Sequence, residues 1–315
     1  MSSTRLIRFS VVLAWLVVAL GAYVRLSDAG LACPDWPGCY GQLGAPVNDA
    51  QRRIALAAFP GQPVEVHKAW KEMLHRYAAG TLGLAILGIF VLAWREKGAA
   101  SRLAAALLAL VSLQALLGRW TVTHLLSPAI VSAHLLGGMA TLALLVWLGW
   151  SRKSDGAAAG APLRRWAAIG LLAVAGQIAL GGWTSAHYAG LACGADLTCR
   201  GSWAPAMDFG AGFSLARAAS LEALTAIHWS HRIGALLVTL ILLPLAGRLL
   251  GAANTRFFGR LVLGLLLLQL GLGIANVGWG LPLSVGVLHN AVAALLLAAL
   301  VALNRHLHNP GGNPP

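Results

Sequence analysis

The chain has 315 residues, of which 58% are hydrophobic and only 10% are charged. A water-soluble protein of this length could not cover so much apolar surface with polar side chains, so the composition indicates an integral membrane protein. The formal net charge of +13 would suit a nucleic-acid-binding protein, but the basic residues are scattered between apolar runs rather than clustered, which argues against nucleic acid as a partner.

Eight stretches are long and apolar enough to cross a bilayer as helices, which takes about 20 mostly apolar residues. The first stretch follows Arg5 and Arg8 as a secretory signal would, but the internal repeat of the chain requires it as a helix. The sequence therefore predicts an all-α integral membrane protein with eight transmembrane helices. In chain order the predicted spans are residues 8–25, 72–94, 102–124, 129–150, 165–187, 222–247, 257–278 and 284–304.

An even number of spans places both termini and the short loops near 95–101, 151–164 and 248–256 on one side of the membrane. That side carries thirteen of the 23 lysine and arginine residues, and its only acidic residues are Glu96 and Asp155. Short loops rich in Lys and Arg stay in the cytoplasm, so we predict cytoplasmic termini in a bacterial-type cell membrane. The thirteen residues are Arg5, Arg8, Arg95, Lys97, Arg102, Arg152, Lys153, Arg164, Arg165, Arg248, Arg256, Arg260 and Arg305.

All four cysteines fall in the two long loops of the opposite face, which is the outer or periplasmic one. Cys33 and Cys39 precede the second span, and Cys193 and Cys199 precede the sixth. An oxidising compartment favours two local disulfides, Cys33–Cys39 and Cys193–Cys199. A tetrahedral zinc site is the alternative, although five residues separate the cysteines of each pair, which is wider than usual for zinc.

The two halves of the chain resemble each other. Ala29–Cys33 recurs as Ala189–Cys193, and each copy is followed by five residues and a second cysteine. Because each half holds four spans, duplicated halves would cross the membrane in the same direction. We therefore predict two parallel, pseudo-symmetric four-helix bundles, 1–150 and 163–315, joined by a linker at 151–162. The other matches, in order and at nearly constant separation, are His75-Arg76 with His231-Arg232, Leu113-Gln114 and Gly118 with Leu268-Gln269 and Gly273, and His134 with His289.

Four histidines lie within about two turns of the outer ends of the even-numbered spans, two in each half. They are His75, His134, His231 and His289. Ionisable residues inside a membrane are costly and are usually functional, and two facing imidazoles in a four-helix bundle can ligate a haem iron from both sides. The alternative is ordinary polar residues at helix ends, but two matching pairs at similar depth favour a di-haem or haem-handling protein.

Charged and polar neighbours accompany these histidines. Arg76 and Arg232 could pair with haem propionates or extend to lipid headgroups. Three residues before the histidines, Glu72 stands in one half and His228 in the other, and the i,i+3 spacing predicts that each points into the same pocket as its histidine. This difference suggests that one site performs chemistry, with Glu72 as an acid, a base or a charge stabiliser, whereas the other holds a cofactor. A helix-start carboxylate favoured by the helix dipole is the alternative for Glu72.

Over nearly all of its length the chain resembles the haem A synthases, membrane enzymes that convert haem O to haem A for terminal cytochrome oxidases. The resemblance rests on Gly30–Cys39, Glu72–Arg76, His134, His231–Ala235 and His289–Ala294. Two histidines depart from the minimal pattern of the family: His124, and His228, which competes as a ligand.

The resemblance implies different roles for the two halves. The C-terminal half would hold haem b through His231 and His289. The N-terminal half would bind haem O as substrate, with His75, His134 and Glu72 needed to oxidise its C8 methyl through an alcohol and a hydrated aldehyde to a formyl group. The expected partners are the enzyme that supplies haem O, an electron donor, membrane lipid and, as an option, a second copy of the chain.

Two other functions compete with this interpretation. A di-haem electron carrier similar to a membrane cytochrome b would not need the Glu72 and His228 difference. A transporter built on parallel repeats would need broken helices near the bilayer midplane, whereas Pro244 is the only proline deep inside a predicted span.

Overall fold

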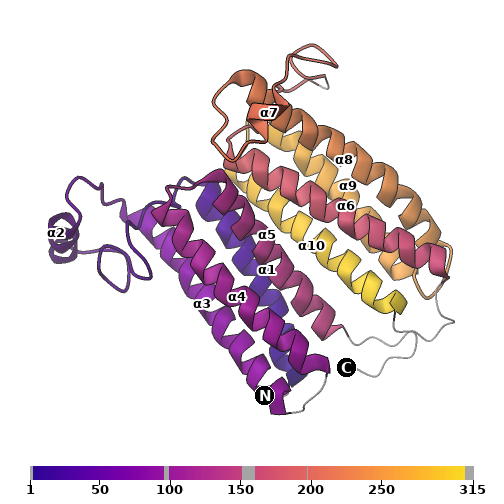
Figure 1. Ribbon diagram of the computed structural model, residues 1–315, viewed down its shortest axis with the longest axis horizontal. Helices are drawn as coiled ribbons and strands as arrows, with labels where there is room; N and C mark the ends of the chain where they lie inside the picture. Colours follow the sequence, from indigo (N-terminus) through magenta and orange to yellow (C-terminus); the bar gives the residue numbers. More distant parts are fainter. Residues whose placement is uncertain (1–2, 96–98, 151–159, 197, 309–315) are drawn as a thin grey trace.

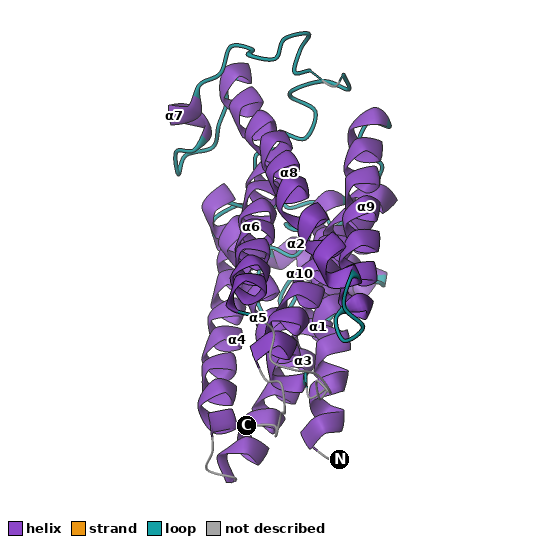
Figure 2. Ribbon diagram, turned by 90° about the vertical axis from the view of Figure 1, so that its right-hand side faces the viewer, coloured by secondary structure: helices purple, strands orange, loops and turns teal. Residues whose placement is uncertain are grey.

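The structure, a computed structural model, describes residues 3–95, 99–150, 160–196 and 198–308. The described residues form helices joined by loops, and none of them forms a strand, as Figure 2 shows. Eight of the helices are long and apolar enough to cross a membrane, which confirms the number of predicted spans and identifies a multi-pass membrane protein. They are α1 (Ser3–Leu26), α3 (Val66–Arg95), α4 (Ala99–Thr123), α5 (Pro128–Gly149), α6 (Ala161–Ala186), α8 (Leu221–Leu250), α9 (Arg256–Gly278) and α10 (Leu283–His308).

The observed helices are longer than the predicted spans at several ends. α3 begins at Val66, because the turn that carries Lys68 and Lys71 continues the helix beyond its apolar part. The outer loops also contain two short helices that hydropathy does not reveal, α2 (Asp49–Ala58) and α7 (Phe209–Gly212). α2 begins with a capping box: the Asn48 side chain accepts a hydrogen bond from the Gln51 backbone N–H, and the Gln51 side chain accepts one from the Asn48 backbone N–H. This local signal fixes where a helix starts.

The membrane helices pack in two rings of four, as Figure 1 shows. In the first ring α1 and α4 each pack against α3 and α5, so α3 and α5 lie diagonally opposite each other. In the second ring α6 and α9 each pack against α8 and α10, and α8 and α10 are the diagonal pair. The rings meet where α1 and α5 contact α10 and where α5 contacts α6. Most of the predicted linker, residues 151–159, lies outside the described residues.

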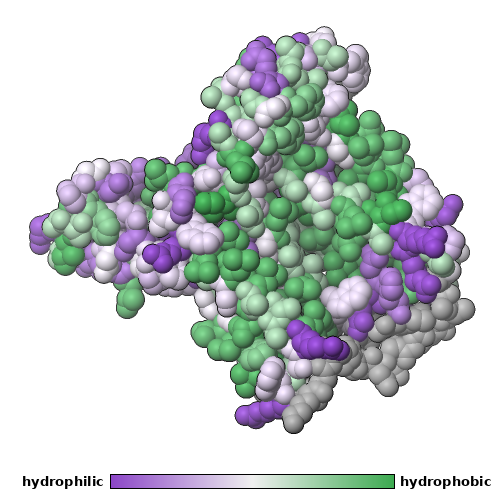
Figure 3. Space-filling view, viewed as in Figure 1, coloured by the Kyte–Doolittle hydropathy of each residue, from purple (hydrophilic) through white to green (hydrophobic). Residues whose placement is uncertain are grey.

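Apolar side chains fill the inside of the rings and also cover their outside. One cluster of buried residues runs through both rings and includes Ile86, Leu142, Leu245 and Leu300. Many large apolar side chains point outward, however, and Figure 3 shows them spread over the helices. Such an extensive apolar surface suits lipid rather than water.

The two long loops that carry the short helices lie at one end of the molecule. In Figure 1 α2 and α7 lie at the end opposite the one where α1 begins and α10 ends. The two cysteine loops connect to these short helices, so they lie at the same end as the start of α3 and α8.

Candidate functional site

The four histidines singled out in the sequence lie on the diagonal helices of the two rings. His75 is on α3 and His134 on α5, while His231 is on α8 and His289 on α10. His75 and His134 are close enough to interact electrostatically, and so are His231 and His289. The structure therefore brings the histidines together as one pair in each ring. His124 is exposed at the end of α4 and belongs to neither pair.

The ring nitrogens of these histidines fit the requirements of an iron ligand. Nδ1 of His75, His134 and His289 is buried and has no hydrogen-bond partner. Buried polar atoms are nearly always paired, so an unpaired buried nitrogen indicates a place for a metal or another group. Among the described residues no three or more His, Cys, Asp or Glu side chains gather as a metal site. A pair of histidines is a ligand set that can hold a haem iron.

Two glutamines without a role in the sequence interpretation contact the C-terminal pair. Gln177 Nε2 lies 3.0 Å from Nδ1 of His231 and also donates to the His231 carbonyl at 2.9 Å. Gln269 Nε2 lies 3.2 Å from Nε2 of His289. A hydrogen bond to the second ring nitrogen orients a metal-binding histidine. The repeated Leu-Gln motif contains Gln269, whereas the only sequence signal for Gln177 is a polar residue inside an apolar span.

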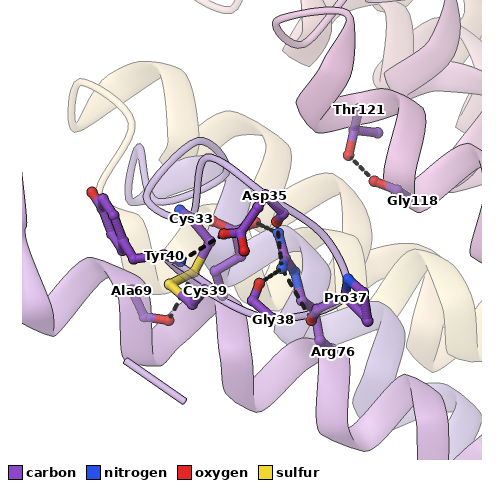
Figure 4. A network of polar contacts seen from close by, with 11 residues as sticks. Cys33, Asp35, Pro37, Gly38, Cys39, Tyr40, Ala69, Arg76, Gly118 and Thr121 are labelled. Carbon is purple, nitrogen blue, oxygen red and sulfur yellow. Dashed lines mark hydrogen bonds and ion pairs between the residues drawn. A yellow bond between two sulfur atoms is a disulfide. The ribbon is translucent and has the colours of Figure 1, made fainter. Parts of the chain in front are cut away.

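Glu72 lies at the junction between α3 and the first cysteine loop. Its carboxylate, in a residue only 4% exposed, accepts hydrogen bonds from the Cys33 backbone N–H at 3.0 Å and from Arg76 Nη2 at 2.5 Å. Arg76 in turn donates to three backbone carbonyls within Asp35–Gly38, as Figure 4 shows. Glu72 and Arg76 together bond this loop to the helix turn that carries His75.

His228 occupies the corresponding junction at the start of α8. Its Nδ1 accepts a hydrogen bond from the Cys193 backbone N–H at 3.2 Å, and Arg232 Nε lies 3.4 Å from its Nε2. Arg232 also donates to three backbone carbonyls between Gly194 and Thr198. A carboxylate at one junction and an imidazole at the other thus make the same contacts.

These contacts differ from the sequence expectation for the two junction residues. The i,i+3 spacing predicts that Glu72 and His228 point into the pockets of the neighbouring histidines, but their hydrogen bonds run to the cysteine loops, because the backbone of the first cysteine approaches the start of each helix. Arg76 and Arg232 bond loop carbonyls, a contact that the sequence does not reveal. Their pairing with propionates remains a prediction.

Both cysteine pairs form disulfides, as the sequence predicts. The S–S distances are 2.03 Å for Cys33–Cys39 and 1.98 Å for Cys193–Cys199. All four cysteines lie within the described residues and none of them is free, so the zinc alternative is wrong. The disulfides close the two loops that Glu72 and His228 hold.

A carboxylate closes the turn of each disulfide loop. Asp35 accepts hydrogen bonds from two backbone N–H groups, one of them that of Gly41. Asp196 accepts from the Thr198 hydroxyl at 2.6 Å and from the Gly201 N–H at 3.0 Å, and these bonds hold the pKa of its carboxyl below the usual value. Gly41 and Gly201 have φ of 72° and 76°, a conformation that favours glycine.

Fold and site together define a class: a multi-pass membrane protein with a pair of histidines inside each of two four-helix rings, suited to holding haem. The family model described as "Cytochrome oxidase assembly protein" (COX15-CtaA) matches residues 4–301. The chain belongs to this family.

Several proteins are similar to the chain. A protein of Shewanella oneidensis named "Heme A synthase" is 42% identical over 98% of this chain and 97% of its own length. A "Heme A synthase" of Caulobacter sp. strain K31 is 31% identical, over 95% of this chain and 94% of its own length. A Natronomonas pharaonis protein named "Protoheme IX farnesyltransferase 1" is 32% identical over 50% of this chain and 30% of its own length.

Proposed function

We propose that the chain is a haem A synthase, an oxidoreductase that converts haem O to haem A for terminal oxidases. The observation that carries this proposal is the 42% identity, over 98% of the chain, to a protein named heme A synthase. The paired histidines with buried, unpartnered nitrogens support it, because they suit haem ligation. The alternative, a di-haem electron carrier, is not favoured by any of the similar proteins.

The C-terminal half, residues 163–315, is the cofactor half in this proposal. His231 and His289 would hold haem b, and Gln177 and Gln269, which contact their rings, would orient them. A bound haem b supplies one-electron transfer. The histidines themselves keep the cofactor in place between α8 and α10.

The N-terminal half, residues 1–150, is the substrate half. His75 and His134 bind haem O, and the C8 methyl is oxidised in successive steps, through an alcohol and a hydrated aldehyde, to a formyl group. Glu72 stands one helical turn before His75 and is paired with Arg76, so it would hold a carboxylate next to this site. That carboxylate can stabilise positive charge that develops on the substrate or accept a proton from it.

The orientation and the duplication are part of the same proposal. Both termini are cytoplasmic and the disulfide loops are periplasmic, which is supported by the excess of basic residues near the short loops. An internal repeat with a linker at 151–162 is supported by the matching contacts at the two loop junctions.

The proposed partners follow from the reaction. An enzyme must supply haem O, and the partial similarity to a protein named protoheme IX farnesyltransferase supports a link to that supply. The successive hydroxylations of the methyl group need a redox partner, proposed to be an electron donor, and the protein lies in lipid. Self-association of the chain is a further option.

The direct test is expression in a host that makes haem O but has no haem A synthesis of its own. Haems extracted from the membranes are separated and identified, and haem A is expected. If the protein is intact and loaded with haem but only haem B and haem O are extracted, the proposed enzymatic activity is wrong and the electron-carrier function is favoured.

Glu72 provides a second arm of this test. Glu72→Ala is expected to stop oxidation while the C-terminal haem stays bound, since Glu72 lies in the other ring. Glu72→Gln removes the negative charge but keeps the contact with the cysteine loop, because the amide oxygen can still accept a hydrogen bond from the Cys33 backbone N–H. Full activity in Glu72→Gln would show that the charge is not needed.

A further inference from the structure

A glycine lies against each histidine of the N-terminal pair, and the proposed function gives these glycines no role. A Cβ on Gly21 of α1 would lie 3.1 Å from Cε1 of His75, and a Cβ on Gly118 of α4 would lie 3.4 Å from Cε1 of His134. The edge of each imidazole therefore rests on the bare backbone of the neighbouring helix, in space that any larger residue would take.

The C-terminal pair has the same contacts. A Cβ on Gly181 of α6 would lie 3.0 Å from Cε1 of His231, and one on Gly273 of α9 would lie 3.2 Å from Cε1 of His289. In both rings the histidines come from one diagonal pair of helices and the glycines from the other. Because a glycine lies against each of the four histidines, chance packing does not explain these contacts.

The distribution of glycine in these helices supports a specific role. Gly21 is the single glycine of α1 and Gly118 is the single glycine of α4. Glycine inside a helix costs about 1 kcal/mol relative to alanine, so its use needs a local reason. Other helical glycines have no such contact: Gly176 of α6 and Gly271 of α9 have nothing within 4 Å of an added Cβ.

The contact fixes the position of the ring. An imidazole can turn about its Cβ–Cγ bond, and a helix packed against its edge limits that rotation. At Gly21, Gly181 and Gly273, where the Cβ would lie 3.0–3.2 Å from the ring, alanine would push the ring away by a few tenths of an ångström, whereas at Gly118 it would just reach contact. Ligand groups at functional sites must be held to within about 0.5 Å, so a shift of this size takes up most of that tolerance and is expected to weaken iron ligation.

We propose that Gly21, Gly118, Gly181 and Gly273 are positioning residues that set the place and plane of the four axial imidazoles. The inference rests on the proposed function, because it assumes that these histidines bind haem. For His289 the ring is held on two sides, by Gly273 at Cε1 and by Gln269 at Nε2.

The C-terminal half offers matched controls for a test that does not depend on turnover. The full-length protein and the variants Gly181→Ala, Gly273→Ala, Gly176→Ala and Gly271→Ala are purified from a host that makes haem b. Haem b per polypeptide and its affinity are measured, together with the low-spin EPR signal of the oxidised haem, which is sensitive to the orientation of the ligand planes.

Gly181→Ala and Gly273→Ala are expected to lose haem affinity by about 10-fold or more and to shift the EPR signal. Gly181→Ala should have the larger effect, because its Cβ would lie nearer the ring, at 3.0 Å rather than 3.2 Å. Gly176→Ala and Gly271→Ala should match the unmodified protein in both measurements.

Two results would overturn the inference while leaving the proposed function intact: unchanged haem affinity and EPR signal in Gly181→Ala and Gly273→Ala, or equal changes in the controls. An unmodified protein that binds no haem would contradict both. If Gly181→Ala does not accumulate, Gly273→Ala decides the question, because its Cβ would lie 3.2 Å from the His289 ring and leaves more room.

Discussion

At the scale of single residues, Glu72 and His228 show how one position can serve two chemistries. Both accept a hydrogen bond from the backbone N–H of the first cysteine in a disulfide loop, and both contact the arginine one helical turn later. The residue types and their pairing with histidines could be predicted from the sequence. The loop contacts could not, because they depend on where a distant backbone segment comes to lie.

The two arginines should therefore differ in their importance for stability. Arg76→Ala leaves the buried Glu72 carboxylate without its counter-charge, which is expected to cost about 3–5 kcal/mol. Arg232→Ala leaves an imidazole, which can be neutral, and should cost only about 1–3 kcal/mol for the lost hydrogen bonds. Equilibrium unfolding of the two purified variants measures the difference. Equal losses of unfolding free energy in the two variants would show that the unbalanced Glu72 charge adds no cost of its own.

At the scale of helices, the apolar runs predicted all eight spans, because lipid requires about 20 apolar residues in each. Their ends were less predictable, since polar turns such as the one that carries Lys68 extend α3 into the aqueous region. Hydropathy does not predict α2 and α7 either, because α2 is short and partly polar and α7 has only four residues.

Helix packing gives a second prediction, which compares two glycines of α6. A Cβ on Gly170 would lie 2.9 Å from Leu242 and 3.3 Å from Leu245, both buried side chains of α8, whereas a Cβ on Gly176 has nothing within 4 Å. Gly170→Ala is expected to destabilise the protein by about 1–3 kcal/mol through overpacking. Gly176→Ala should be neutral or slightly stabilising, because alanine favours the helix.

Thermal unfolding of both α6 variants in the same detergent provides the measurement. If Gly170→Ala is as stable as Gly176→Ala, α6 and α8 can move apart at this contact without any loss of stability, which would contradict the prediction.

At the scale of the whole molecule, the structure arranges the eight helices as two rings with a histidine pair in each. The repeated motifs in the sequence indicate this division, since matching histidines appear in the same order in each half. How the rings meet could not be predicted, because those contacts, such as the hydrogen bond from Trp15 Nε1 to the Ala291 carbonyl, link α1 with α10 across 276 positions.

The proposed orientation predicts which loops react from outside the cell. All four native cysteines are in disulfides, so an impermeant maleimide should label only an introduced cysteine. Leu43→Cys, at a residue that is 89% exposed in the first outer loop, should be labelled in intact cells. Ala253→Cys, between α8 and α9, should be labelled only after the membrane is opened. The reverse labelling pattern would show that the membrane orientation is opposite to the proposed one.

The division of labour between the halves is the central claim, and extraction of haems from two matched variants tests it most directly. With haem O supplied, His75→Ala is predicted to keep haem b and to make no haem A, because His75 binds the substrate. His289→Ala is predicted to lose haem b. Loss of haem b in His75→Ala, or normal haem A formation by that variant, would contradict the account.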